Sequence, residues 1–188
     1  RGSRILDVGC GIGGSSRLLA EYYGFNVSGI TICPAQVKRA LELTPSELNC
    51  DFQVMDALDL KFEDGAFDGI WSVEAGVYMK DKIKFADEML RTLRPGGFLV
   101  VADWNSRDYE IHPPSLFDKV ILNKLLEQWV YPNLISINKF RDILHKNKYS
   151  SGKIMSQNWN LYTNPTWSDS IMEVIRRPNA ILSLGLVL

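Results

Sequence analysis

The sequence predicts an α/β protein with a doubly wound, mostly parallel sheet. Five short apolar runs of strand length alternate with segments in which apolar residues recur at helical spacing. A glycine-rich turn follows the first of these runs. Parallel strands need crossover connections, and such crossovers are right-handed. The chain has 188 residues, of which 46% are hydrophobic, so it is long enough to bury the core of one domain.

Local stop and start signals place the elements along the chain. Gly24 follows the first helical segment as a stop, and Pro34 suits the first position of the second helix. Pro95, in RPGG, is expected to end the third helix before the fifth strand. We expect strands at residues 4–8, 25–30, 51–55, 67–72 and 98–102, and helices at residues 14–23, 34–43 and 81–93.

The pattern changes after Asp103. We expect helices at residues 116–130, 137–147 and 167–175, and a sixth strand at 153–159. Residues 104–188 are predicted to form a cap and outer layer on the core of residues 1–103, within one domain spanning residues 1–188. The first strand begins at once and the chain ends in AILSLGLVL, so we expect a fragment of a longer protein. Whether the last strand of the sheet lies within it stays open.

The composition excludes several classes of partner. A formal net charge of -1 provides no basic field for nucleic acid. The sequence has no window of about 18 uncharged apolar residues that would predict a transmembrane segment, although peripheral contact of the apolar tail with a membrane stays open. The three cysteines have no metal-ligand spacing, which predicts no metal site and favours reduced thiols in an intracellular protein. The sequence supports no prediction of oligomeric state.

The predicted topology indicates where a ligand binds. In open parallel sheets the binding crevice lies outside the carboxyl ends of the strands. The residues expected along that rim are Asp7 to Gly14, residues 30–32, Asp56, residues 72–78 and Asp103.

The glycine loop alone fits two ligands. Gly9, Gly11 and Gly14 match the dinucleotide pattern G-x-G-x-x-G, but Thr31 stands where that pattern needs an acid. Asp7 ends the first strand, where we expect its carboxylate to face a ligand. It would repel a pyrophosphate and could hold a cationic amino group. An amino acid joined to a nucleoside is therefore favoured over NAD, and a simple strand-to-helix turn remains the alternative.

Several segments together resemble a known family. LDVGCGIGG, GITICPAQ, DALDLKFEDGAFDGIWSVEAG and LRPGGFLVVADW resemble the class I S-adenosylmethionine-dependent methyltransferases. Within them the chain is most similar, over nearly its whole length, to the gamma-tocopherol methyltransferase-like group of plants and cyanobacteria. That resemblance implies a Rossmann-like fold and methyl transfer in vitamin E (tocopherol) biosynthesis. It also implies S-adenosyl-L-homocysteine as a product, and a location in the cytoplasm or a plastid.

The resemblance also implies a set of donor-binding residues. Asp7, Gly9 and Gly11 would hold the methionine moiety while Gly13 shapes the turn. The ribose hydroxyls would meet the stretch from Thr31 to Gln36, and the alternative is that these are an ordinary strand and helix residue. The remaining implied contacts are Ile32 at the end of the second strand, Asp56 and Ala57 at the adenine, and Ser72 and Val73 near the sulfonium. Asp56 as a turn or capping aspartate stays open.

The acceptor side departs from the family. Relatives usually carry a histidine where this chain has Tyr78, and a phenol with a pKa of about 10 is a weaker base. Methyl transfer is an in-line displacement, and a base near an acceptor hydroxyl would assist it. The candidates are Glu74 and Asp103, with Tyr78 orienting the acceptor; His112 is more simply a loop residue.

Four functions are compatible with these residues, and the first is preferred. It is methylation of a small, hydrophobic, prenylated phenol or quinol. The others are N- or O-methylation of a small amine or alkaloid, a non-catalytic nucleoside-binding module, and an NAD-dependent oxidoreductase.

Overall fold

The structure is a computed structural model that describes residues 1–116, 119–120, 123, 134–163 and 165. The chain divides into two compact units, Arg1–Ile154 and Met155–Leu188. The first unit contains the sheet and the residues predicted to bind ligand. Among the described residues, no helix is long and apolar enough to cross a membrane.

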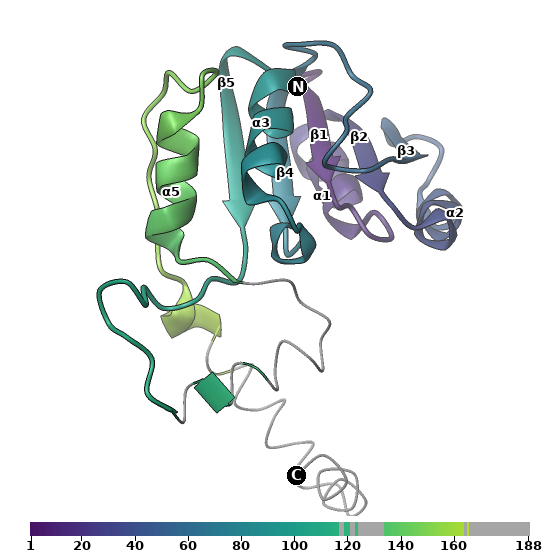
Figure 1. Cartoon of the computed structure of the whole chain (residues 1–188). Helices are drawn as coiled ribbons and strands as arrows, with labels where there is room; N and C mark the ends of the chain where they lie inside the picture. The colour runs from purple at the N-terminus through teal and green to yellow at the C-terminus, as the bar shows by residue number, and fades with distance from the viewer. Residues whose placement is uncertain (117–118, 121–122, 124–133, 164, 166–188) are drawn as a thin grey trace, which may run out of the picture. The chain divides into compact units, whose positions relative to one another are not determined.

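The sheet of the first unit is parallel and has five strands in the order β3-β2-β1-β4-β5 (Figure 1). The chain winds outward from β1 to β3 and then returns to the other side of β1, so the switch point lies between β1 and β4. The strands are β1 (Arg4–Val8), β2 (Asn26–Thr31), β3 (Cys50–Val54), β4 (Phe67–Val73) and β5 (Leu93–Ala102).

Helices cover both faces of the sheet. Right-handed crossovers put the helices that precede β2 and β3 on one face, and the helix between β4 and β5 on the other (Figure 1). The elements are α1 (Gly14–Tyr23), α2 (Pro34–Leu43), a 3-10 turn η1 (Gly76–Tyr78), α3 (Lys82–Thr92) and α5 (Ile137–Lys146). Pro34 takes the first turn of α2, as predicted.

Each face of the sheet has its own apolar core. On one face Leu6, Val8 and Ile70 pack in a cluster with Phe85 and Met89 of α3. On the opposite face, side chains of β1, β2 and α1 form a second cluster, against which Trp71 packs. Along β1 the side chains alternate between the two faces, so Asp7 points to the side of Ile5 and α1 rather than to the side of α3.

The RPGG segment belongs to β5 instead of ending the third helix. The prediction of a strand starting at residue 98 is wrong, because β5 begins at Leu93 directly after α3. The register shifts between the pairs Phe67 with Leu93 and Gly69 with Phe98, which accommodates the extra residues. Among the described residues β5 is an edge strand, where a proline costs no ladder hydrogen bond on its free side.

Beyond Asp103, one predicted helix is confirmed, the predicted strand is wrong, and two predicted helices lie partly or wholly outside the described residues. The helix expected at residues 137–147 is confirmed as α5. The sixth strand expected at residues 153–159 is wrong: these residues have no regular structure, and most of them are exposed. Leu116, Lys119, Val120 and Asn123 are helical within the predicted helix 116–130. The rest of that segment and the helix expected at 167–175 lie outside the described residues.

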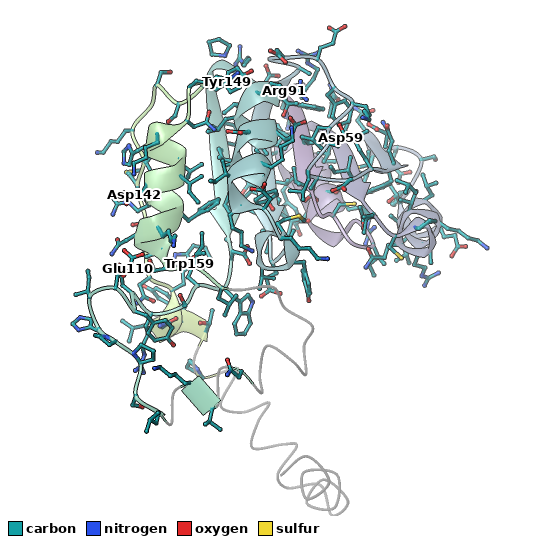
Figure 2. The ribbon with its side chains drawn as sticks, viewed as in Figure 1. Asp59, Arg91, Glu110, Asp142, Tyr149 and Trp159 are labelled. Carbon is teal, nitrogen blue, oxygen red and sulfur yellow. The ribbon has the colours of Figure 1, made fainter. Side chains whose placement is uncertain are left out.

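A buried ion pair on α3 fixes the connection between β3 and β4. The Arg91 guanidinium donates to the Glu88 carboxylate at 2.9 Å and to the carbonyls of Leu60 and Phe62 at 2.9 and 2.8 Å. Glu88 also accepts the Leu60 N–H at 2.9 Å. Burial acts to raise the pKa of Glu88, but the hydrogen bonds from Arg91 and Leu60 outweigh it and hold that pKa below its ordinary value. Arg91 lies at the end of the sheet opposite the carboxyl ends of the strands (Figure 2).

Arg91→Ala should destabilise the fold strongly, because the buried Glu88 carboxylate then keeps, among the described residues, only the half-exposed Lys84 ammonium and the Leu60 N–H as partners. The carbonyls of Leu60 and Phe62 also lose their donor. We expect the free energy of unfolding to fall by about 3 kcal/mol at neutral pH, measured by urea denaturation. Because the folded-state pKa of Glu88 is depressed, its stabilising effect is present above the unfolded-state pKa and is lost as the pH falls through the folded-state pKa.

Arg39→Ala is the matched control, since the ion pair of Arg39 with Glu42 is exposed. It should change the free energy of unfolding by less than about 0.5 kcal/mol. Equal effects of the two variants would contradict the role assigned to Arg91.

Candidate functional site

The glycine loop joins β1 to α1 at the switch point of the sheet. Gly9, Gly11 and Gly13 have φ of 78°, 55° and 77°, a region that favours glycine. The N–H groups of Gly9 and Cys10 both donate to the carbonyl of Ile30, each at 2.9 Å, which ties the loop to the end of β2. A Cβ on Gly11 would meet no atom within 4 Å, so a ligand has room to approach this backbone closely.

The start of α1 is open to an anion. No side chain caps its N-terminus, and its first turn has no acidic residue. The unpaired N–H groups and the helix dipole make such an end suitable for a carboxylate.

Asp7 lies beneath that first turn. Its side chain is 1% exposed, and its Oδ2 accepts hydrogen bonds from the hydroxyls of Ser15 at 2.7 Å and Ser16 at 2.6 Å. Burial raises the pKa of Asp7, and the two hydroxyls only partly oppose that rise. Sequence reasoning placed this carboxylate on an open rim and missed both serines. The signal available was the pair SS directly after GIGG, one helical turn above the strand end.

Thr31 and Gln36 form a single uncharged polar group at the end of β2. The Thr31 hydroxyl donates to Gln36 Oε1 at 2.6 Å and accepts the Cys33 N–H at 3.4 Å. Gln36 Oε1 accepts from the Thr31 hydroxyl, so the amide nitrogen of this exposed side chain is the group that can donate to a ligand. Ile32 beside them is 71% exposed and offers an apolar surface.

The end of β3 carries the other predicted donor contacts. Asp56 is exposed, and its Oδ1 accepts the Leu58 N–H at 2.8 Å, so part of this carboxylate does serve the turn. Ala57, next to it, is buried. Both residues therefore lie on the predicted rim, with Asp56 partly engaged in local structure.

The end of β4 contains residues with different surroundings. Ser72 is buried and its hydroxyl donates to the Val8 carbonyl at 3.0 Å, so it joins β4 to β1. Val73 is partly exposed. Among the described residues, Glu74 alone has a positive φ without being glycine, at 53°, and its N–H donates to the Ala102 carbonyl at 2.8 Å. Strained backbone of this kind often occurs at functional sites. Tyr78 ends η1 and is 54% exposed.

Asp103 follows β5 and packs against η1. Burial raises its pKa to about 6, and the nearby Glu74 carboxylate adds to that effect. Hydrogen bonds from the N–H groups of Trp104 and Val77 and the charge of Lys82 act in the opposite direction. A carboxylate with this pKa can exchange a proton near neutral pH.

The strand ends bring these residues to one edge of the sheet, with the arrowheads of β1, β4 and β5 pointing the same way (Figure 1). His112 lies in an exposed turn. No group of three or more potential metal ligands occurs among the residues that the structure describes.

Comparison with known protein families identifies the family of this chain. A family profile described as a methyltransferase domain matches residues 6–101. The chain belongs to this methyltransferase-domain family. The matched residues begin in β1 and end in β5, just before Asp103, so they include the glycine loop and the ends of the other four strands. The fold is the Rossmann-like sheet of such domains.

Two relatives of this methyltransferase domain have names that state a methyl acceptor. The chain is 50% identical over 185 residues to the 2-methyl-6-phytyl-1,4-hydroquinone methyltransferase of Synechocystis sp., covering 98% of this chain and 58% of the relative. It is 38% identical to the chloroplastic tocopherol O-methyltransferase of Arabidopsis thaliana, covering 87% and 48%. The chain thus spans about half the length of these relatives.

A solved structure supports the same fold for this methyltransferase domain. The geranyl diphosphate C-methyltransferase of Streptomyces coelicolor A3(2), solved in complex with Mg2+, geranyl diphosphate and S-adenosyl-L-homocysteine, superposes with a TM-score of 0.62 at 25% identity. The match covers 78% of this chain and 54% of that protein.

Proposed function

We propose that the chain is the donor-binding part of an enzyme that transfers a methyl group from S-adenosyl-L-methionine to a prenylated phenol or quinol. The observation that carries the proposal is the pairing of the buried Asp7 carboxylate with the uncapped start of α1. An amino acid presents an ammonium and a carboxylate on one carbon, and these two features have the complementary charges. The 50% identical phytyl-hydroquinone methyltransferase supports the acceptor class.

The methionine moiety is assigned to the glycine loop. Its ammonium binds the Asp7 carboxylate, whose Oδ2 already accepts both serine hydroxyls, and its carboxylate meets the first-turn N–H groups of α1. Gly11 is the open side of the loop, while Gly9 and Gly13 shape it. A dinucleotide would instead place a pyrophosphate next to the buried carboxylate, which is unfavourable.

The nucleoside is assigned to the ends of β2 and β3. Ribose hydroxyls would hydrogen-bond the Thr31 and Gln36 pair, and Ile32 would pack against the adenine. The adenine amino group would donate to Asp56, with the Ala57 N–H at the ring. Val73, beside Ser72, would lie near the sulfonium. Thr31 carries no charge to hold a ribose diol in the way that NAD enzymes do, which disfavours an oxidoreductase.

The acceptor is a small, hydrophobic aromatic compound that would lie beyond the ends of β4 and β5. Its hydroxyl proton passes to Asp103, which is mostly ionised at neutral pH because its pKa is about 6. Glu74 is the second candidate base, and Tyr78 would orient the ring. The name of the chloroplastic relative supports a location in a plastid, and a cytoplasmic location is the alternative.

The chemistry is then an in-line displacement. As the acceptor hydroxyl loses its proton, its electron pair is delocalised into the ring, and a ring carbon attacks the methyl group. The new carbon–carbon bond forms while the sulfur–methyl bond breaks, and the sulfonium becomes the neutral thioether of S-adenosyl-L-homocysteine. Loss of the ring proton to solvent restores aromaticity. The protein chiefly aligns donor and acceptor, since the donor is already activated by its positive charge.

Asp7→Asn should separate ligand binding from stability. The amide oxygen can still accept from Ser15 and Ser16, so the fold is retained, but the charge that holds the ammonium is lost. We expect the affinity for S-adenosyl-L-homocysteine, measured by calorimetry, to fall at least about tenfold.

The free energy of unfolding of Asp7→Asn should not fall at neutral pH. Because burial raises the folded-state pKa of Asp7, the wild-type protein loses stability relative to this variant as the pH rises through that pKa. Asp59→Asn, which alters an exposed carboxylate paired with Lys61, is the control and should bind like wild type. Unchanged affinity in folded Asp7→Asn would remove Asp7 from the donor site.

A direct assay tests the proposed reaction. The full protein is incubated with methyl-labelled S-adenosyl-L-methionine and a panel of phytylated hydroquinones, tocopherols and tertiary-amine precursors. We expect label in the ring of a phytylated quinol, identified by mass spectrometry of the product. Label only in an amine would indicate the N-methyltransferase alternative, and donor binding with no transfer to any acceptor would indicate a binding module.

A further inference from the structure

We propose that Lys82 is a positioning residue of the acceptor site, which holds η1 in place and presents Asp103 to the acceptor hydroxyl as an ionised carboxylate. This inference rests on the proposed function, because it needs an acceptor whose proton Asp103 removes. Three separate elements meet at this point: the end of β5, the turn η1 and the first residue of α3.

The contacts of Lys82 fix the backbone of η1. Its Nζ donates to the carbonyl of Gly76 at 2.5 Å and to that of Val77 at 3.2 Å. Lys82 is itself held firmly, because it opens α3 directly after Asp81, whose side chain caps the helix by accepting the Lys84 N–H at 2.9 Å. The orientation of η1, and with it the backbone at Tyr78, therefore depends on the ammonium of Lys82.

Asp103 packs on the same short turn. A Cβ on Gly76 would lie 2.3 Å from Asp103 Oδ2, so only a glycine lets the carboxylate approach this closely. The Val77 N–H donates to the carboxylate from η1, and the Trp104 N–H donates to Oδ1 at 2.9 Å. Lys82 and Asp103 thus engage opposite ends of the Gly76–Val77 peptide group, Lys82 its carbonyl and Asp103 its N–H.

Within the part of the chain that the structure describes, two charged groups act on Asp103. Lys82 approaches from α3 and Glu74 from the end of β4. The side chains that α5 and the segment before it add to the adjoining cavity of about 70 Å³ are apolar: Leu134, Ile135, Ile137 and Phe140. Lys82 is therefore the charge that opposes burial at Asp103, while Glu74 acts in the same direction as burial. Burial lowers the pKa of Lys82, and Asp103 partly offsets this.

The charges around Asp103 determine how its pKa changes when Lys82 is replaced. Without Lys82, burial and Glu74 act on Asp103 with less opposition, so its pKa rises above about 6 and a larger fraction of the carboxyl group is protonated at neutral pH. A protonated carboxyl cannot accept the acceptor proton. The rate of methyl transfer near neutral pH should then fall, while donor binding at the glycine loop should not change.

Three substitutions test this role in the full protein. Lys82→Gln removes the charge but keeps a donor for the η1 carbonyls, Lys82→Met removes both, and Lys82→Arg keeps the charge. Lys80→Met, at an exposed lysine outside this cluster, is the matched control. Circular dichroism establishes folding, and Lys82→Gln keeps the test valid if Lys82→Met does not fold.

The first measurement follows the carboxyl carbon of Asp103 by NMR titration, with the resonance assigned through Asp103→Asn. We expect the pKa of Asp103 to rise by about one unit in Lys82→Gln and Lys82→Met, and to remain near the wild-type value in Lys82→Arg and Lys80→Met. An unchanged titration in folded Lys82→Gln would overturn the proposal. The titration needs no acceptor, so its result can be interpreted even if the protein does not carry out the proposed reaction.

The second measurement is the pH profile of kcat with a phytylated hydroquinone. The acid limb should move to higher pH by the same amount in Lys82→Gln, with the affinity for S-adenosyl-L-homocysteine within twofold of wild type. A purely structural role would lower kcat at every pH without moving the limb, and that result would also overturn the proposal. Absence of transfer by the wild-type protein would instead contradict the proposed function.

Discussion

The buried carboxylate of Asp7 is the constraint on which the rest of the site depends. It lies where β1 ends, beneath the first turn of α1, and is 1% exposed. Water cannot solvate this charge, and Ser15 and Ser16 supply hydrogen bonds to one oxygen but no opposite charge. The raised pKa of Asp7 reflects this lack of water and of an opposite charge. In the proposed site a ligand ammonium would supply the missing charge, so stability is given up at the position proposed to bind the donor.

A second carboxylate, Asp103, lies at the end of β5, and different groups stabilise its charge. Its partners are backbone N–H groups and the Lys82 ammonium, which belong to the protein and do not depend on a ligand. In the proposed reaction the two carboxylates have different roles. Asp7 would gain its countercharge from the bound donor, whereas Asp103 would exchange a proton with the acceptor. The switch point of the sheet lies between β1 and β4. In the proposed site the methionine and nucleoside residues lie at the ends of β1, β2 and β3, the acceptor residues follow β4 and β5, and Val73 at the end of β4 lies where the two groups meet.

Sequence patterns predicted the elements that local signals specify. The apolar runs that became β1 and β4, and Pro34 at the start of α2, are visible without knowledge of the fold. RPGG misled because proline and glycine break helices and most strands, yet a register shift on an edge strand accommodates them. The residues along the rim could be predicted from the topology of a parallel sheet. The role of Ser72 between two strands could not, because its hydroxyl bonds the Val8 carbonyl, which is distant in sequence. The contacts of Asp7 with two serines of α1, and of Lys82 with η1, are close in sequence, but they depend on how a strand or a turn meets the helix that follows it, which residue patterns do not specify.

The central claim is that the glycine loop binds an amino acid joined to a nucleoside through the charges of that amino acid. Calorimetry with three ligands tests it directly: S-adenosyl-L-homocysteine, 5′-methylthioadenosine, which lacks the amino-acid part, and NAD. We expect micromolar binding of S-adenosyl-L-homocysteine, binding of 5′-methylthioadenosine at least about tenfold weaker, and no comparable binding of NAD. Equal affinity for the first two ligands, or preference for NAD, would contradict it.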